Sequence, residues 1–284
     1  THAPATDRFA ALDAWRGLAA LAVALYRLEA NGAFYGLGFV RNSWLFVDFF
    51  FVLSGFVIAF AYLDRIEDGR STAKFTLRRF GRLWPLHIAM LLAFVALEGV
   101  HLIQGEPSFQ GAKAPWTLLP ELALAHGLGI TGLTDWNSPS WSISTEFWTY
   151  LVFAALVLGF RRQMALAATI VAVLSLGVLV SVSTTGMDVT FDYGFLRCLA
   201  GFFTGVLTLM LWRIVKDRVV LPMPTLLEVA TLVVMIGFVT LAGRTALSYA
   251  APFVFGMAVL VFSFQRGALS HMLLTRPMQA IGEW

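Results

Sequence analysis

Long apolar stretches constrain the fold of this chain more than any other feature of its sequence. A helix needs roughly 20 mostly apolar residues to cross the hydrocarbon core of a bilayer, and within lipid it satisfies its own backbone hydrogen bonds. Stretches that approach this length cover roughly residues 10–30, 44–63, 82–104, 141–160, 163–183, 191–212, 225–242 and 248–264. We therefore predict an all-α, polytopic bundle of about 8–10 transmembrane helices, forming a single domain over residues 1–284.

The composition agrees with a membrane protein and argues against several other classes. Hydrophobic residues make up 58% of the chain and charged residues only 13%, whereas soluble domains carry about 25% charged residues. The net charge of +3 is too small to indicate nucleic-acid binding. Cys198 is the single cysteine, which excludes an internal disulfide and a metal site built from several cysteines. We expect no metal and no covalently bound cofactor.

A weaker apolar stretch, roughly residues 117–133, contains a proline, a glutamate, a histidine and several glycines. Such a stretch can form a short, re-entrant or interfacial helix. Membrane proteins carry most of their Lys and Arg residues on the cytoplasmic side. If 117–133 does not cross, only Arg41, Lys113 and Arg244 fall on the opposite side, whereas a crossing divides the charges almost evenly. We therefore expect no full crossing there, with the N-terminus and the 64–82 loop in the cytoplasm.

The first predicted span carries three charged residues, Asp13, Arg16 and Arg27. Charged groups inside a bilayer are costly and mark a functional site or a buried ion pair. Arg16 and Arg27 are separated by three helical turns plus about 20°, so they share one helix face. Asp13 lies one turn before Arg16, close enough for an ion pair near the cytoplasmic interface. Arg27 can snorkel to the far interface, or pair with Glu29 or another helix.

The second span carries an intramembrane carboxylate, Asp48, followed by Ser54 and Gly55. Small residues allow two helices to approach closely, so Ser54 and Gly55 are expected to serve packing. Charged residues inside the membrane mark function or buried pairing, so Asp48 is a candidate site residue.

Three arginines, Arg78, Arg79 and Arg82, precede the third span, and Pro85 follows them. Their spacing places the guanidinium groups on one side of a helix start, where Pro85 fits an early turn or a kink. Arginine binds phosphate groups through paired hydrogen bonds. Two roles are open: anchoring to lipid headgroups, or binding a phosphorylated ligand from the cytoplasm.

A further polar face begins the stretch 141–160. Ser142, Glu146 and Tyr150 recur at intervals of four residues and therefore share one helix face. Glu146 lies about one turn into an apolar span, where a carboxylate needs a partner. Arg16 or Arg27 can supply that partner in a structural ion pair. Alternatively, Glu146 orients a reacting group.

Arg197 is another charge within a predicted span and also requires a partner. Tyr193 lies one turn before it and shares its helix face. Gly201 and Gly205 follow in the spacing of a close-packing motif.

Four of these segments, in order and at the usual spacing, resemble the membrane-bound acyltransferase family 3. They are LDAWRGLAA at 12–20, VDFFFVLSGF at 47–56, RRFGRLWP at 78–85 and WSISTEFWTYL at 141–151. Weaker likeness at 197–202 and 277–284 extends the resemblance over nearly the whole chain. Members of this family are similar to the sugar and polysaccharide O-acyltransferases of bacterial envelopes.

The resemblance implies a transferase in the bacterial inner membrane that moves an acyl group, acetyl first of all, from cytoplasmic acyl-CoA to a carbohydrate or glycolipid hydroxyl. It implies CoA binding by Arg78, Arg79 and Arg82. Asp13, Arg16 and Glu146 are expected to orient or assist the catalytic group. The candidate substrate-binding residues are Asp48, Trp141, Ser142, Tyr150 and Arg197. The expected partners are the lipid bilayer, acyl-CoA and the acceptor, with no nucleic acid.

One departure from the family pattern concerns the chemistry. In the family, an Arg in the first helix is followed after ten residues by a His that serves as general base. Here Arg16 matches the Arg, but Arg27 stands where the His is expected. A neutral imidazole accepts a hydroxyl proton, whereas a guanidinium stays protonated and has no acceptor. We therefore expect little or no transfer, unless Glu146 serves as the base.

Two alternatives remain open from the sequence alone. One is a transporter or lipid-binding protein whose intramembrane charges line a path. The other is an inactive family member with a binding or regulatory role. Acyl-CoA would stabilise an enzyme of this family but not a transporter. A stretch like 277–284 precedes one more helix in the family, so we expect the chain to stop short of it at Trp284.

Overall fold

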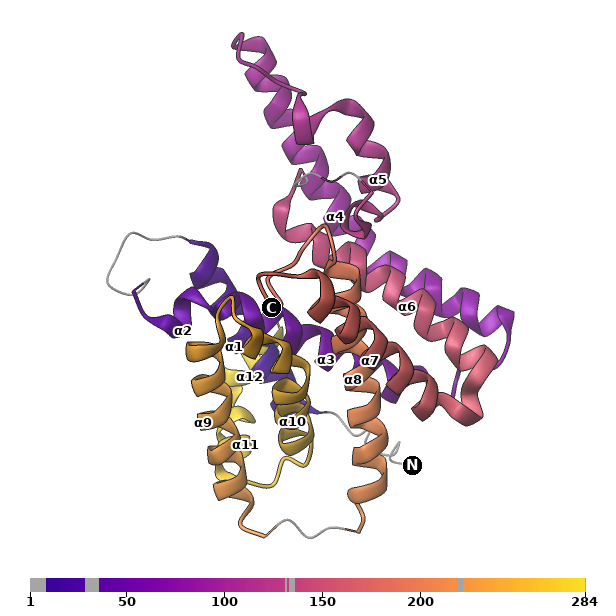
Figure 1. Cartoon of the computed structure of the whole chain (residues 1–284), viewed down its shortest axis with the longest axis vertical. Helices are drawn as coiled ribbons and strands as arrows, with labels where there is room; N and C mark the ends of the chain where they lie inside the picture. Colours follow the sequence, from indigo (N-terminus) through magenta and orange to yellow (C-terminus); the bar gives the residue numbers. More distant parts are fainter. Residues whose placement is uncertain (1–8, 29–35, 131, 133–135, 219–221, 284) are drawn as a thin grey trace. The chain divides into compact units, whose positions relative to one another are not determined.

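The computed structural model describes residues 9–28, 36–130, 132, 136–218 and 222–283 (Figure 1). All regular secondary structure in these ranges is helical, which confirms the predicted all-α class. The chain forms two compact units, and the family-like segments are divided between them. Helices α3 (Phe46–Tyr62) and α8 (Gly194–Val215) each contribute residues to both units.

The first unit comprises Thr1–Phe60, Thr184–Met187 and Gly201–Trp284. Besides parts of α3 and α8, its helices are α1 (Ala10–Arg27), α2 (Gly38–Arg41), α9 (Pro224–Ala242), α10 (Ala251–Ser263), α11 (Ala268–Leu273) and α12 (Arg276–Glu283). Helix α1 packs against α12, α10 and α11, and α9 packs against α10 and α2. The C-terminal helices therefore return to the first helix of the chain.

Glycines allow α3 and α8 to meet backbone to backbone within this unit. A Cβ added to Gly55 would lie 1.9 Å from the Phe202 carbonyl oxygen, and one added to Gly205 would lie 1.9 Å from the Val52 oxygen. Neither position can hold a larger residue without moving a helix. The predicted packing roles of Gly55 and of the Gly201/Gly205 motif are confirmed.

The second unit comprises Ala61–Ser183 and Asp188–Ala200. Its main helices are α4 (Gly69–Ile103), α5 (Leu118–Leu122), α6 (Trp141–Phe160) and α7 (Met164–Val182). Helix α4 packs against α6, and a 3-10 turn at Arg161–Gln163 joins α6 to α7.

The structure corrects the predicted start of the third span. Helix α4 begins at Gly69 and runs for 35 residues, so the predicted loop 64–82 is wrong after residue 68. A capping box starts this helix, because the Asp68 carboxylate accepts from the Ser71 N–H and the Ser71 hydroxyl lies against the Asp68 backbone. A helix this long extends about 52 Å, well beyond a hydrocarbon core of about 30 Å. Pro85 lies in its interior rather than in an early turn.

In the described parts of the chain, 6 helical segments are long and apolar enough to cross a membrane. They are Ser43–Tyr62, Gly69–Ile103, Ser138–Val182, Gly194–Val215, Pro224–Ala242 and Ala246–Ser263. They cover seven of the eight predicted stretches. Segments 141–160 and 163–183 form one 45-residue helical run that contains α6 and α7. The stretch 10–30 forms α1, but Asp13, Arg16 and Arg27 make it too highly charged to be one of the six.

The weak stretch 117–133 forms only short helical pieces where it is described. Pro115–Thr117, α5 and His126–Leu128 are each five residues or fewer. None of these pieces reaches the roughly 20 residues needed to cross a bilayer, in agreement with the expected lack of a full crossing.

Candidate functional site

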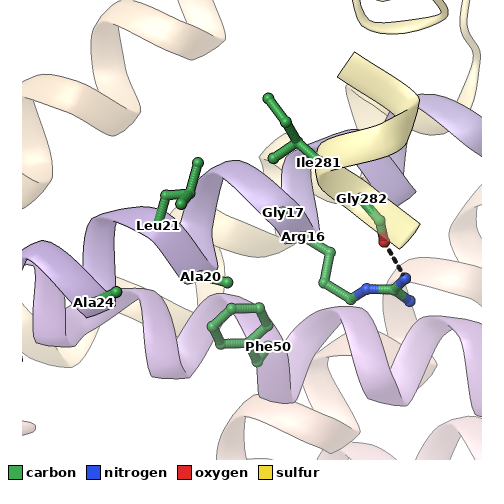
Figure 2. A pocket seen from close by; sticks show the side chains of 8 residues that line it. All are labelled: Arg16, Gly17, Ala20, Leu21, Ala24, Phe50, Ile281 and Gly282. Atoms are coloured by element: carbon green, nitrogen blue, oxygen red, sulfur yellow. Dashed lines mark hydrogen bonds between the residues drawn. The ribbon is translucent and has the colours of Figure 1, made fainter. Parts of the chain in front are cut away.

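The Asp13–Arg16 ion pair predicted on α1 is present in the structure. The Arg16 Nη1 atom lies 3.5 Å from the Asp13 Oδ1 atom, and both side chains are partly exposed. Arg16 also donates from Nη2 to the Gly282 carbonyl oxygen at 2.6 Å (Figure 2). This second contact ties the first helix to α12 and fixes the direction of the guanidinium.

A cavity of about 590 Å³ opens beside Arg16. Its volume lies within the roughly 300–1,000 Å³ typical of small-molecule sites. The lining is mainly apolar and comes from α1, α3 and α12 (Figure 2). The lining residues are Arg16, Gly17, Ala20, Leu21, Ala24, Phe50, Ile281 and Gly282. One cationic group at the edge of an apolar pocket can orient a polar or anionic ligand.

Two glycines make the crossing of α1 and α12 close enough to form one end of this cavity. A Cβ added to Gly17 would lie 2.4 Å from the Ile281 carbonyl oxygen, and one added to Gly282 would lie 2.4 Å from the Asp13 oxygen. Sequence reasoning missed the contribution of α12. Its only signal was the weak family likeness of residues 277–284.

Arg27 lies in the last turn of α1 and is exposed. Arg27 lies three positions after Ala24, so helical spacing places it one turn beyond the cavity on the same side of α1. Its guanidinium carbon lies 5.8 Å from the centre of the neighbouring Tyr26 ring. The suggested pairing of Arg27 with Glu29 falls outside the described residues.

Asp48 is completely buried in the first turn of α3. Its main-chain oxygen lies near Gly201, at the close approach of α3 and α8. Phe50, two residues later, reaches the cavity instead (Figure 2). Asp48 is absent from the cavity lining, so its predicted role in binding a substrate stays a prediction.

The three predicted phosphate-binding arginines lie inside α4 rather than at its start, and they do not behave alike. Arg78 and Arg82 are exposed and one turn apart. Arg79 is half-buried, and its Nη2 atom donates to the Tyr62 hydroxyl at 3.3 Å. Its guanidinium carbon also lies 5.3 Å from the centre of the Tyr62 ring. Arg79 therefore has a structural partner in its own unit.

The early start of α4 reveals two basic residues that the sequence analysis left out. Arg70 and Lys74 precede Arg78 and Arg82 at intervals of four residues, and all four side chains are exposed. They form a basic stripe (Arg70, Lys74, Arg78, Arg82) about 18 Å long. The spacing was visible in the sequence, but residues 64–82 were expected to form a loop.

The predicted polar face of α6 is present only in part. The Tyr150 hydroxyl donates to the Glu146 Oε1 atom at 2.5 Å, and Tyr150 is buried while Glu146 is half-buried. The Ser142 hydroxyl instead donates to the Pro139 carbonyl oxygen at 3.1 Å. The structure therefore joins Glu146 with Tyr150, and Ser142 with the turn before the helix.

Arg197 finds partners within its own unit, as a buried charge must. It is 1% exposed, and its Nη1 atom donates to the Val189 carbonyl oxygen at 3.1 Å. Its guanidinium carbon lies 5.6 Å from the centre of the buried Trp141 ring. A Cβ on Gly194 would lie 2.8 Å from that ring, so a larger residue there would displace the Trp141 side chain. Trp141 and Arg197 are thus brought together.

The predicted site residues fall into both units. Asp13, Arg16, Arg27 and Asp48 belong to the first unit, and the remaining predicted residues belong to the second. Glu146 belongs to the second unit, whereas Arg16 and Arg27 belong to the first. The pairing of Glu146 with either arginine therefore stays a prediction.

The helices and the site define a multi-pass membrane protein with a cationic group beside an apolar cavity. The particular family follows from comparison with known proteins. The family model described as an acyltransferase domain matches residues 9–283, and the chain belongs to this acyltransferase family. Membership favours the enzymatic hypothesis over a transporter.

Three proteins are similar to parts of the chain. Protein 2 in the picA locus of Rhizobium radiobacter is 34% identical over 164 residues, which are 52% of this chain and 82% of that protein. Acyltransferase MdmB of Streptomyces mycarofaciens is 36% identical over 110 residues, 38% of this chain and 26% of that protein. Peptidoglycan O-acetyltransferase OatA of Listeria monocytogenes serovar 1/2a is 29% identical over 164 residues, 53% of this chain and 24% of that protein. No solved structure matches the chain.

Proposed function

We propose that this protein is built to transfer an acyl group, acetyl first of all, from acyl-CoA to a hydroxyl of an envelope carbohydrate. The hydroxyl oxygen attacks the thioester carbonyl carbon, the CoA thiolate leaves, and a base takes the hydroxyl proton. The membrane is the bacterial inner membrane, and the N-terminus is cytoplasmic. Family membership and the names of MdmB and OatA support the reaction class.

The observation that carries the proposal is the cavity along α1. Arg16 is held at its edge by Asp13 and by the Gly282 carbonyl oxygen. Position 27 follows on the same side of α1, one turn beyond Ala24. A bound acceptor at this end of the cavity would present its hydroxyl to position 27.

Arg27 makes the chain a poor catalyst in this scheme. A guanidinium donates hydrogen bonds but has no lone pair to take a proton. General-base catalysis contributes roughly 10²–10⁴-fold, so its loss lowers the rate by about that factor. A binding or regulatory role without turnover is the second candidate function, and Arg27 is the observation that favours it.

The donor's phosphates are assigned to the basic stripe on α4. Its four cations are exposed over about 18 Å, and Lys and Arg both bind phosphate. Arg79 is left out of this assignment because Tyr62 holds its side chain. The basic stripe thus replaces the predicted CoA-binding set of Arg78, Arg79 and Arg82. Lipid headgroups are the alternative ligand for the stripe.

The first experiment compares the Arg27→His variant with the parent protein, which carries Arg27. Membranes holding each protein are supplied with radiolabelled acetyl-CoA and a polysaccharide acceptor, and transfer is counted. Arg41→His is the matched control, since Arg41 is also exposed and lies at the end of α2. We expect a gain of about 10²-fold or more for Arg27→His and none for Arg41→His.

Equal transfer by the parent protein and the Arg27→His variant would show that the residue at position 27 is not the general base. In that case Glu146→Gln should abolish transfer, because the Glu146–Tyr150 pair is the remaining candidate. Unchanged turnover in Glu146→Gln would exclude that residue too. Transfer by neither protein, with binding of acetyl-CoA retained, would favour the role without turnover.

The second experiment tests the basic stripe. In the Arg27→His protein, the double change Arg78→Ala and Arg82→Ala should raise the KM for acetyl-CoA about tenfold, as expected if each lost contact is partly screened by solvent. The effect should shrink as salt is raised. Arg162→Ala is the control, because Arg162 is an exposed arginine outside α4. Equal effects of both changes would point to general attraction rather than a donor site.

A further inference from the structure

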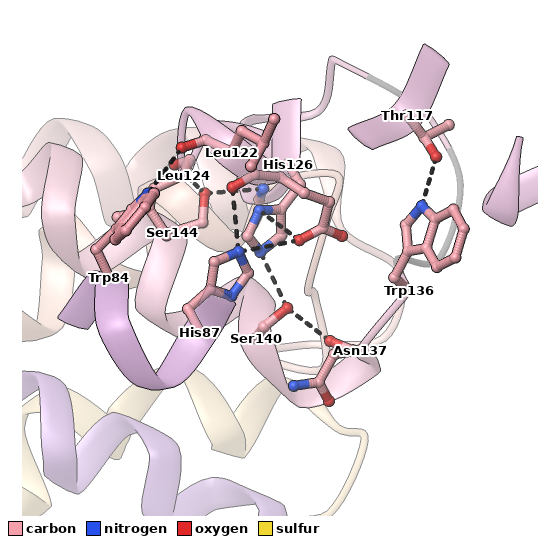
Figure 3. A network of polar contacts seen from close by, with 12 residues as sticks. Trp84, His87, Thr117, Leu122, Leu124, His126, Trp136, Asn137, Ser140 and Ser144 are labelled. Atoms are coloured by element: carbon pink, nitrogen blue, oxygen red, sulfur yellow. Dashed lines mark hydrogen bonds and ion pairs between the residues drawn. The ribbon is translucent and has the colours of Figure 1, made fainter. Parts of the chain in front are cut away.

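A buried cluster in the second unit lies outside every role assigned above. It consists of His87 on α4, Glu121 on α5 and His126 in the following 3-10 turn. All three side chains are about 1% exposed. The imidazole rings of His87 and His126 stack with centres 5.1 Å apart (Figure 3). One possible ligand atom from each residue lies within 4.8 Å of the other two.

The hydrogen bonds around His126 show which of its ring nitrogens bears the hydrogen. The Ser140 hydroxyl donates its one hydrogen to the Asn137 carbonyl oxygen at 2.6 Å. Ser140 must therefore accept from the His126 Nε2 atom, which lies 3.0 Å away (Figure 3). In the neutral ring, the Nδ1 atom then carries a lone pair.

The His126 lone pair points to a carboxylate rather than to a donor. Its Nδ1 atom lies 3.2 Å from the Glu121 Oε2 atom. Neither Glu121 oxygen nor His126 Nδ1 has a hydrogen-bond partner among the described residues. Two buried acceptors that face one another at this distance need a cation between them.

The two distances from Glu121 to the histidines suit a tetrahedral metal ion. Zinc binds imidazole nitrogen and carboxylate oxygen at about 2.0–2.2 Å, which places neighbouring ligand atoms about 3.3–3.5 Å apart. The Glu121 Oε2 atom lies 3.3 Å from His87 Nε2 and 3.2 Å from His126 Nδ1. Both Glu121 oxygens lack hydrogen bonds, so a bidentate carboxylate and two imidazoles supply four donor atoms.

We propose that His87, Glu121 and His126 bind one divalent transition-metal ion, zinc above all. His87 Nε2 also lies 3.1 Å from the Glu121 carbonyl oxygen, a contact that it exchanges for the metal. Ser140 then holds His126 by its other nitrogen, the usual arrangement for a metal-bound histidine.

The role of this ion is structural. The Ser144 hydroxyl donates to the Leu124 carbonyl oxygen at 2.6 Å and accepts from the Gly127 N–H at 2.9 Å, so α6 already holds the 124–127 segment. The metal adds a tie to α4 through His87. It thereby fixes α4 relative to α6, the helix that carries Glu146.

The test uses the whole protein, purified without a histidine tag, stripped with a chelator and then given zinc. We expect about one tightly held zinc per chain, measured by elemental analysis, and a tetrahedral absorption spectrum when cobalt replaces zinc. Glu121→Gln and His126→Gln should lose both signals. His101→Gln is the matched control, since His101 sits beside Glu98 and Glu106 but is one-third exposed.

A second readout is independent of acyl transfer. Cys198 is buried and lies in the second unit, so a thiol-reactive dye reports when that unit opens on heating. Zinc should raise the labelling temperature of the stripped protein, because a ligand specific to the folded state stabilises it. If the Glu121→Gln variant fails to fold, zinc uptake by the stripped parent protein still tests the proposal. No uptake of zinc by the parent, or equal uptake by the variants, would overturn the proposal and leave a shared proton between Glu121 and His126.

Discussion

Replacing Gly17 with alanine tests the crossing of α1 and α12 on which the cavity depends. The new methyl group would lie 2.4 Å from the Ile281 carbonyl oxygen and 2.8 Å from the Gly282 nitrogen. Both are main-chain atoms, which cannot rotate away as the end of a side chain can. Ordinary contact begins at 3.4 Å, so α12 must move by about 1 Å.

The expected loss of folding stability follows from this displacement. Overpacking of this kind costs roughly 1–3 kcal/mol. A shift of about 1 Å also stretches the Arg16–Gly282 hydrogen bond from 2.6 Å beyond its normal range. Because Arg16 is 42% exposed, losing that bond adds only about 1 kcal/mol. Alanine regains about 1 kcal/mol of helix propensity, so the net loss of stability is about 1–3 kcal/mol.

The assay is thermal unfolding of the detergent-solubilised protein, followed by the fraction that stays monodisperse on size exclusion. Gly177→Ala is the control, because Gly177 lies in α7 with open space around its Cβ position. That change should leave the midpoint unchanged or raise it slightly. In the Arg27→His protein, Gly17→Ala should also lower acetyl transfer. A midpoint for Gly17→Ala equal to or above that of the parent would refute the close crossing.

Two further predictions concern carboxylates that cap helices. Glu228 is 2% exposed and accepts from the Gly267 N–H, the Ser270 N–H and the Ser270 hydroxyl. Glu228→Ala should destabilise the first unit by about 2–4 kcal/mol, measured by thermal unfolding; a loss below that of an exposed substitution would contradict the cap. The Ser71 N–H and hydroxyl lower the pKa of Asp68, so this cap stabilises α4 at neutral pH and is lost as the pH falls through the lowered pKa. Asp68→Asn keeps the acceptor but does not titrate, so circular dichroism should show less acid sensitivity of the helix; an unchanged acid profile would exclude Asp68 as its cause.

Several features of the protein were predictable because they depend on short spacings along the chain. Runs of apolar residues predict membrane helices, since helix length and bilayer thickness are both known. The Asp13–Arg16 pair and the Glu146–Tyr150 pair lie one turn apart, so helical periodicity brings them together. Glycine at position 55 predicted a close helix approach for the same local reason.

The start of α4 is also encoded locally, but by polar residues rather than by an apolar run. Asp68 and Ser71 form a capping box that was legible in the sequence. Recognising it would have placed Arg70 and Lys74 on the same helix as Arg78.

Contacts between distant segments were decided only by the tertiary structure. Arg16 meets Gly282 across 266 positions of the chain, and His87 meets Glu121 across 34. Helical periodicity says which residues share a face, but it does not say which other helix that face will meet. The cavity beside Arg16 and the buried histidine–glutamate cluster depend on that second choice, which packing of side chains in three dimensions makes.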